Sequence, residues 1–278
     1  MTIRFTKMHG LGNDFMVIDA VSQKINLQPE QVQAFSKRSS GIGFDQCLIV
    51  EAPRDKDSDF FYRIFNANGQ EVGQCGNGAR CLARYVQHYK LSTKKTIAVA
   101  TCTTKMQLQL NDDHSVTVNL GLPKFEPQDI PSKAANIAEF YQLPITNGLA
   151  KVHAINVGNP HAVMVVDNLS SIPLASLGKE LSEHLFFPEQ TNVGFMEIIA
   201  ANQLRLRVYE RGCGETQACG SGAVAAAAIG RLWYKMAERI RVSLTGGDLY
   251  IDWPDTQGPI YLTGPATFVY EGVVMSCA

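Results

Sequence analysis

The sequence lacks an excess of charge of either sign. Its 25 lysine and arginine residues nearly balance 26 aspartate and glutamate residues, and the formal net charge of the 278 residues is -1. Proteins that bind nucleic acid or anionic membrane surfaces need a basic face that neutralises phosphates. The composition therefore predicts no nucleic-acid partner and favours a small-molecule ligand.

Long apolar segments are also missing. The chain contains no uninterrupted apolar run of about eighteen residues, the length that indicates a bilayer span. Its first ten residues, MTIRFTKMHG, lack the apolar core of a secretory signal. We therefore expect no membrane association and a cytoplasmic location.

The cysteines do not follow the pattern of a disulfide framework or of a zinc site. Their number is odd, and they are spread over the whole chain, which predicts reduced thiols. Two pairs, Cys75 with Cys81 and Cys213 with Cys219, each enclose five residues, whereas paired zinc ligands usually enclose about two to four. We therefore expect no metal. The seven cysteines are residues 47, 75, 81, 102, 213, 219 and 277.

The pattern of apolar residues predicts an α+β chain. Helices are expected at 29–38 and 173–184, and after the two Cys-Gly motifs described below. The proline-rich stretch 120–150 is expected to connect two halves and to contain a short helix from Ser132. Strands are expected at 2–9, 15–19, 46–51, 60–66, 96–101, 106–110, 115–119, 152–157, 162–166, 193–199, 203–209, 240–244, 249–253 and 260–270.

An internal duplication relates the two halves. Cys75-Gly-Asn-Gly and Cys219-Gly-Ser-Gly lie 144 residues apart, and the preceding Glu71 and Glu215 have the same spacing. The helix after Cys75 carries one apolar stripe, whereas the segment AVAAAAI after Gly222 is apolar all round. Such a helix requires burial on every side, so we expect it inside a curved sheet, with its counterpart placed similarly.

Polar residues recur in register with these motifs. Asn13 and Asn159 follow a glycine in each half, and Asn66 and Glu210 stand nine residues before each cysteine. Gln46 and Asn192 form a further amide pair. One interpretation is that the repeat preserves only a folding unit with small buried cysteines. We favour a functional site, because amides are costly to bury without partners.

Cysteines at helix starts suit proton transfer at carbon. The unpaired N–H groups and positive partial charge there stabilise a thiolate and hold a carboxylate. Two such thiols on opposite sides of one ligand could invert a carbon centre, one removing the α-hydrogen and the other supplying a hydrogen. Preorganised amides would stabilise the carbanion between these steps.

Six segments resemble those of the diaminopimelate epimerases. They are MHGLGNDF at 8–15, GFDQ at 43–46, FNANGQEVGQCGNGARC at 65–81, GNPH at 158–161, TNVGF at 191–195 and YERGCGETQACGSGA at 209–223. The resemblance implies interconversion of LL- and meso-diaminopimelate, in lysine and peptidoglycan-precursor synthesis, without pyridoxal phosphate or another cofactor. Departures from the family are Cys213, where a small residue is common, and Asn68, where aspartate is common.

The same resemblance implies the roles of individual residues. Cys75 and Cys219 are the acid–base pair, and His161 and Glu210 tune them. The groups that bind substrate are Asn13, Gln46, Asn66, Gly76, Asn77, Asn159, Asn192, Glu210, Arg211, Gly220 and Ser221. Arg211 suits the distal carboxylate and Glu210 an ammonium group. A purely structural His161 is the alternative at that position.

The resemblance also implies an architecture. Two pseudo-symmetric domains, each a curved and mostly antiparallel sheet wrapped around a central helix, are expected at 1–119 and 120–264, with the active site in the cleft between them. The C-terminal strand 265–278 is expected to return to the first domain. A homodimer is expected, with Tyr270 at a family position associated with dimer contact, although an isolated aromatic residue could equally belong to the core.

Three other functions are compatible with part of the pattern. A proline or hydroxyproline racemase also uses opposed cysteines, but Glu210-Arg211 and the several amides suit a longer substrate. A thiol-disulfide oxidoreductase would usually place both thiols in one Cys-x-x-Cys turn, and the sequence has none. A non-catalytic ligand-binding protein with incidental thiols is the third alternative.

Overall fold

The protein is an α+β chain whose described residues divide into two compact units. The computed structural model describes residues 2–73 and 75–275, so Cys277 lies outside the described residues. One unit runs to Val118 and includes the segment from Gly264 onward, and the other is Asn119–Thr263. No helix among the described residues is long and apolar enough to cross a membrane.

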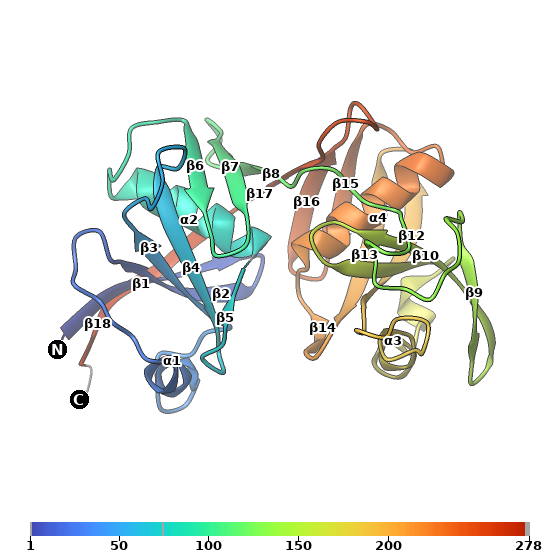
Figure 1. Ribbon diagram of the computed structural model, residues 1–278, viewed down its shortest axis with the longest axis horizontal. Coiled ribbons are helices and arrows are strands. Elements are labelled where there is room, and N and C mark those ends of the chain that lie inside the picture. Colours follow the sequence, from blue (N-terminus) through green and yellow to red (C-terminus); the bar gives the residue numbers. More distant parts are fainter. Residues whose placement is uncertain (1, 74, 276–278) are drawn as a thin grey trace. The chain divides into compact units, whose positions relative to one another are not determined.

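The first unit surrounds one long helix with strands (Figure 1). This helix, α2 (Gly76–His88), contacts β1, β2, β3 and β7. A shorter helix, α1 (Pro29–Ser36), covers a second apolar cluster that includes Val32, Cys47 and Phe65. The strands are β1 (Thr2–Gly10), β2 (Asn13–Asp19), β3 (Gln46–Glu51), β4 (Phe60–Asn66), β5 (Glu71–Val72), β6 (Thr96–Ala100), β7 (Lys105–Leu110), β8 (Val116–Asn119) and β18 (Thr267–Met275).

The second unit has the same plan. Its central helix is α4 (Gly220–Trp233), and α3 (Leu174–Ser182) covers a second apolar cluster, with a short 3-10 helix, η1 (Leu169–Ser171), before it. The strands are β9 (Tyr141–Ile145), β10 (Gly148–Asn156), β11 (Pro160–Val165), β12 (Asn192–Ala200), β13 (Gln203–Glu210), β14 (Gly214–Thr216), β15 (Arg239–Leu244), β16 (Gly247–Asp252) and β17 (Tyr261–Gly264).

Strand pairings repeat between the units, in partner and in direction. The first two strands of each repeat pair antiparallel, the next pairing is parallel, and a second parallel pairing follows later in each unit. The equivalent pairs are β1–β2 and β10–β11, β2–β3 and β11–β12, β3–β4 and β12–β13, β4–β6 and β13–β15, and β6–β7 and β15–β16. The predicted α+β class and duplicated plan are therefore confirmed.

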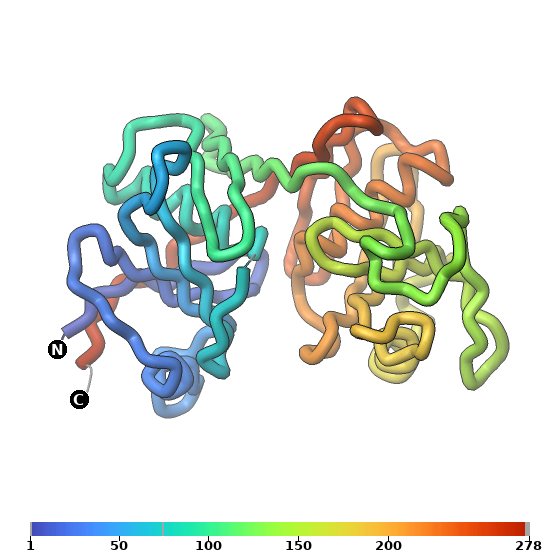
Figure 2. The backbone as a smooth tube through the Cα atoms, in the orientation of Figure 1, coloured from blue at the N-terminus to red at the C-terminus, as the bar shows by residue number. Residues whose placement is uncertain are grey.

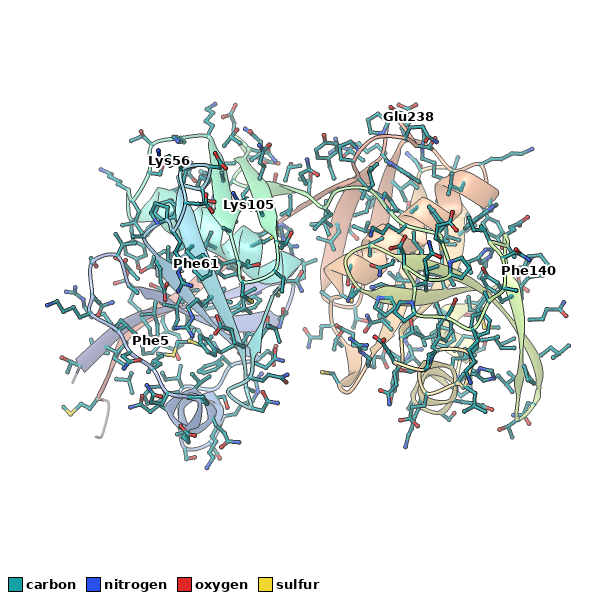
Figure 3. The ribbon with its side chains drawn as sticks, viewed as in Figure 1. Phe5, Lys56, Phe61, Lys105, Phe140 and Glu238 are labelled. Atoms are coloured by element: carbon teal, nitrogen blue, oxygen red, sulfur yellow. The ribbon has the colours of Figure 1, made fainter. Side chains whose placement is uncertain are left out.

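The burial of α4 follows from its composition. Its residues Gly222–Gly230 are all buried, as the apolar segment predicts, because small alanines let strands approach the helix on every side. In α2 the stripe of Leu82, Tyr85 and Val86 is buried, and exposed residues first appear at its last turn. Figure 3 shows side chains filling the space around both helices.

The C-terminal strand pairs with the N-terminal one. β18 runs antiparallel to β1, with Thr2 opposite Met275, and the tube in Figure 2 shows the last segment beside the first. The single strand predicted at 260–270 is wrong. It is broken at Pro265 and Ala266, which separate β17 from β18, because proline supplies no N–H to a ladder.

The stretch 120–150 is more than a connection. It contributes Ile130 and Leu143 to the apolar cluster under α3, and it contains β9. The helix predicted from Ser132 is wrong. The N–H of Ser132 instead donates to Pro127 O and that of Lys133 to Phe186 O, so these residues follow the turn at 127–131 and contact the loop after α3.

Candidate active-site residues

Cys75 caps the central helix of the first unit. Its backbone is extended, with φ -153° and ψ 107°, so it lies just outside the helix while its side chain faces the first turn. The Sγ atom accepts a hydrogen bond from Gly78 N at 3.3 Å. A thiol held in this way is placed where a helix start stabilises negative charge.

Two amides and a carboxylate converge beside this cap. The Sγ atom of Cys75 lies 4.0 Å from Asn13 Oδ1, and Asn77 Nδ2 donates to the same oxygen at 3.2 Å. Asn13 Nδ2 in turn donates to Asp45 Oδ2 at 2.9 Å. The β2 strand therefore brings Asn13, which is distant in sequence, directly to the cysteine.

An ionic cluster anchors the segment that carries Asn13. Asp14 accepts hydrogen bonds from Arg38 at 3.0 Å and from Lys7 at 2.5 Å. Burial opposes ionisation of Asp14, but these two cations outweigh it and lower the pKa of its carboxyl to about 2. Asp45 N also donates to Asp14 Oδ1 at 2.9 Å, which ties the start of β2 to the loop before β3.

Gln46 and Asn66 lie opposite each other on adjacent strands. They are register partners in the β3–β4 pair, and Gln46 Nε2 donates to Asn66 Oδ1 at 2.9 Å. The Oε1 atom of Gln46 is buried and has no hydrogen-bond partner among the described residues. An unsatisfied buried acceptor of this kind suits a ligand donor such as an ammonium group.

Cys219 repeats the cap in the second unit. Its Sγ accepts from Gly222 N at 3.4 Å and lies 3.6 Å from Ser221 Oγ. The residue is 4% exposed. Burial raises the pKa of this thiol well above its ordinary value, the negative charge of Glu210 raises it further, and the bonds from Ser221 and Gly222 oppose both.

His161 contacts Ser221, the residue whose hydroxyl lies beside Cys219. Its Nε2 lies 3.0 Å from Ser221 Oγ and 3.1 Å from Asn159 Oδ1. The side chain is fully buried, and burial, with the charge of Arg211, lowers its pKa to about 3. The imidazole is therefore neutral at ordinary pH, and it fixes the Ser221 hydroxyl that faces the thiol.

Asn192 and Arg211 are joined through the backbone. Asn192 starts β12 opposite His161, and its Oδ1 accepts from Arg211 N at 3.0 Å. The Arg211 side chain is exposed and donates from Nη1 to Glu189 O at 2.8 Å. Glu210 ends β13, where it accepts from Thr216 Oγ1.

Glu71 and Glu215, which occupy equivalent positions in the two halves, each pair with an arginine. Arg63 donates to both oxygens of Glu71 at 2.9 and 2.8 Å. Arg207 makes the same two bonds to Glu215 at 2.8 and 2.9 Å. Each pair bridges the hairpin that leads into a cysteine cap, so these glutamates position the loop and lie outside the cluster around the thiol.

The sequence analysis missed two buried polar side chains near Cys75. Tyr62 and Arg80 are both fully buried, and Tyr62 Oη has no hydrogen-bond partner among the described residues. An ideal Cβ at Gly78 would lie only 2.3 Å from that oxygen. The one signal in the sequence is a charged residue, Arg80, within the apolar part of α2.

Tyr270 is a partly exposed residue of β18. It is 46% exposed and packs edge-on against Phe5, with ring centroids 6.0 Å apart (Figure 3 labels Phe5). Val269, Val273 and Met275 of the same strand are also exposed. In the part of the chain that the structure describes, no cluster of three or more histidine, cysteine, aspartate or glutamate side chains could hold a metal ion.

Comparison with known proteins gives consistent matches over the whole chain. The family model described as diaminopimelate epimerase matches residues 5–126 and 153–269. A diaminopimelate epimerase of Legionella pneumophila strain Philadelphia 1 is 57% identical over 277 residues, which cover 99% of this chain and 100% of that protein. The corresponding protein of strain Paris is 56% identical over the same length.

Solved structures share the fold at much lower identity. A PhzF-family phenazine biosynthesis protein of Bacillus anthracis superposes with a TM-score of 0.70 at 16% identity, over 99% of this chain and 100% of that chain. A hydroxyproline epimerase from Agrobacterium vitis gives 0.70 at 14% identity, over 98% and 92% of the two chains. These likenesses concern the architecture alone.

Proposed function

Because the chain belongs to the diaminopimelate epimerase family, we propose that its reaction, the interconversion of LL- and meso-diaminopimelate, uses Cys75 and Cys219 as an acid–base pair. The observation that carries this proposal is the duplicated cap. Each cysteine precedes the first residue of a central helix, and each Sγ accepts from the N–H three residues further on, at 3.3 and 3.4 Å.

The proposed chemistry is a two-base proton transfer. One thiolate removes the α-hydrogen from the substrate, and the other thiol delivers a proton to the opposite face of the same carbon. The first cysteine ends as a thiol and the second as a thiolate, so the net charge of the pair is unchanged. The helix starts at Gly76 and Gly220 offer N–H groups to the α-carboxylate, where charge develops during the reaction.

The amides and charged groups divide the recognition of a zwitterionic substrate between them. We assign substrate binding to Asn13, Gln46, Asn66, Asn77, Asn159, Asn192, Glu210, Arg211 and Ser221. The exposed guanidinium of Arg211 suits the distal carboxylate. The buried, unsatisfied Oε1 of Gln46 supports a contact with a donor group of the substrate.

Cellular context and assembly are part of the proposal. An enzyme of lysine and peptidoglycan-precursor synthesis that needs reduced thiols fits the cytoplasm, and the odd number of cysteines supports this location. We assign the exposed apolar residues of β18, including Tyr270, to a homodimer contact. Neither pyridoxal phosphate nor a metal has a role in this scheme.

Stereochemical conversion of purified diaminopimelate isomers in D2O tests the proposal. We expect Cys75→Ala and Cys219→Ala each to abolish epimerisation, while Cys102→Ala, at an exposed cysteine in a loop, retains it. Added pyridoxal phosphate or a metal chelator should leave the rate of epimerisation unchanged. Epimerisation that survives either active-site substitution, or turnover of proline in place of diaminopimelate, would overturn the assignment.

A further inference from the structure

The two cysteines cap their helices in the same way, but the charged residues at equivalent positions around them differ. Position 66 is asparagine, and its equivalent 144 residues on is Glu210. Position 80 is arginine, and its equivalent is Val224, which is fully buried in α4. The Cys75 site thus carries an additional cation, and the Cys219 site carries an additional carboxylate.

Arg80 is a buried cation with incomplete hydrogen bonding. Its side chain is 0% exposed, and Nε donates to Pro265 O at 3.1 Å. Both Nη atoms are buried and have no hydrogen-bond partner among the described residues. A buried charge without a counterion is costly, so an anion within reach would offset that cost.

Arg80 lies beside residues that surround Cys75. It follows Asn77 by three residues on α2, so the two side chains lie on the same face of the helix. A Cβ at Gly10 would lie 3.1 Å from Arg80 Nη2 and 3.4 Å from Asn77 O. Gly10 is the strand partner of Asn13, whose Oδ1 lies 4.0 Å from Cys75 Sγ.

The neighbouring thiol does not compensate Arg80. Cys81 is fully buried, and burial raises its pKa far above the ordinary value, so it stays protonated. The negative charges that favour ionised Arg80 are those of Cys81 and Cys75. The other of these two groups is Cys75, which is partly buried and caps the helix start.

We propose that Arg80 holds Cys75 as the resting thiolate of the pair, which leaves Cys219, whose site has Val224 in place of Arg80, as the resting thiol. The inference rests on the acid–base pair proposed above and makes Arg80 a positioning residue. Turnover from this resting state moves one proton from substrate to Cys75 and one from Cys219 to substrate. The charge of Arg80 then favours return of the proton from Cys75 to Cys219.

Thiol alkylation of the full chain as a function of pH tests this assignment. Iodoacetamide labelling resolved by peptide mass spectrometry gives separate midpoints for Cys75 and Cys219, apart from the exposed Cys102 and Cys213. In the wild type we expect the Cys75 midpoint below, and the Cys219 midpoint above, the ordinary thiol value of about 8.5. The reverse order would overturn the proposal.

Three substitutions separate charge from structure. Arg80→Met should raise the Cys75 midpoint by about one to two units, the effect of removing an opposite charge at close range. Arg80→Lys keeps the positive charge, so its Cys75 midpoint should lie closer to the wild-type value than that of Arg80→Met. Arg84→Met, one turn further along α2, is the matched control and should leave it unchanged. A merely structural Arg80 would alter the labelling rate at every pH and leave the midpoint in place.

The outcomes also distinguish this inference from the proposed function. If Cys75→Ala retains epimerisation, the acid–base pair itself is wrong. If epimerisation requires Cys75 but Arg80→Met leaves its midpoint unchanged, only the role of Arg80 fails. If Arg80→Met does not fold, the order of the two wild-type midpoints and the midpoint of Arg80→Lys still test the role of Arg80.

Discussion

Substitution of Gly78 by alanine should destabilise the first unit, because the helix meets a buried tyrosine there. An ideal Cβ at this position would lie 2.3 Å from Tyr62 Oη and 3.2 Å from Leu48 Cδ2. Tyr62 is fully buried, so its ring is held by the surrounding core. Overpacking of this kind typically costs about 1–3 kcal/mol.

Gly76 provides the matched control for this substitution. It lies on the same first turn of α2, and a Cβ there would meet no atom within 4 Å. Both substitutions gain helix propensity, up to about 1 kcal/mol in a helix interior, so the difference between them isolates the clash. We expect the melting temperature of Gly78→Ala to lie roughly 2–10 °C below that of Gly76→Ala.

A second substitution tests the origin of that difference. Because Tyr62 Oη makes no hydrogen bond to the described residues, Tyr62→Phe should cost little by itself. Combined with Gly78→Ala, it should recover part of the lost stability, which a double-mutant cycle measures. Equal melting temperatures for the two glycine variants, or no recovery in the double variant, would refute the reasoning.

Three further predictions concern groups outside the helix caps. A double-mutant cycle on Arg63→Gln and Glu71→Gln, measured by urea unfolding, should give a coupling free energy of about 0.5–1 kcal/mol between the two side chains. A value near zero would show that this ion pair does not stabilise the hairpin. The lowered pKa of Asp14, about 2, gives stability that is present above pH ~4 and lost toward pH 2; Asp14→Asn should flatten this loss in acid unfolding. Val273→Lys should shift sedimentation toward a monomer and Val21→Lys should not; two unchanged profiles would exclude β18 as the contact.

The cysteine caps could be predicted because the signal is local. A polar cap, two glycines and an apolar helical pattern lie within one short segment of each half, and the repeat shows both at once. The burial of α4 on all sides was likewise contained in its run of alanines. Such features depend on residues adjacent in sequence, where periodicity and capping rules apply directly.

Other features depended on contacts that sequence patterns do not specify. The strand β5 is only Glu71–Val72, too short for an alternating pattern, and the ion pair from Arg63 defines its position. The apolar run at 260–270 looked continuous, yet β17 and β18 belong to different units. Long-range packing determines the strand with which each half of this run pairs.

The burial and contacts of polar side chains were the features least predictable from the sequence. The resemblance names His161 as a residue that tunes a cysteine, whereas its complete burial and its contact with Ser221 are visible only in the structure. Arg80 resembled an ordinary helix residue, since arginine has good helix propensity. Only its burial, with two unsatisfied nitrogens, distinguishes it.

Comparison of the two halves distinguishes positions that fix the backbone from positions that determine the charge near each cysteine. The Arg63–Glu71 bridge recurs as Arg207–Glu215 with nearly the same distances, because each unit must fix the hairpin before its thiol. Positions next to the thiols instead differ in charge, as at Arg80 and its equivalent Val224. For the proposed acid–base pair, mutual repulsion already disfavours ionisation of both thiols, so even identical sites would share one proton. Unequal charges around the two sulfurs therefore decide which of them holds that proton at rest.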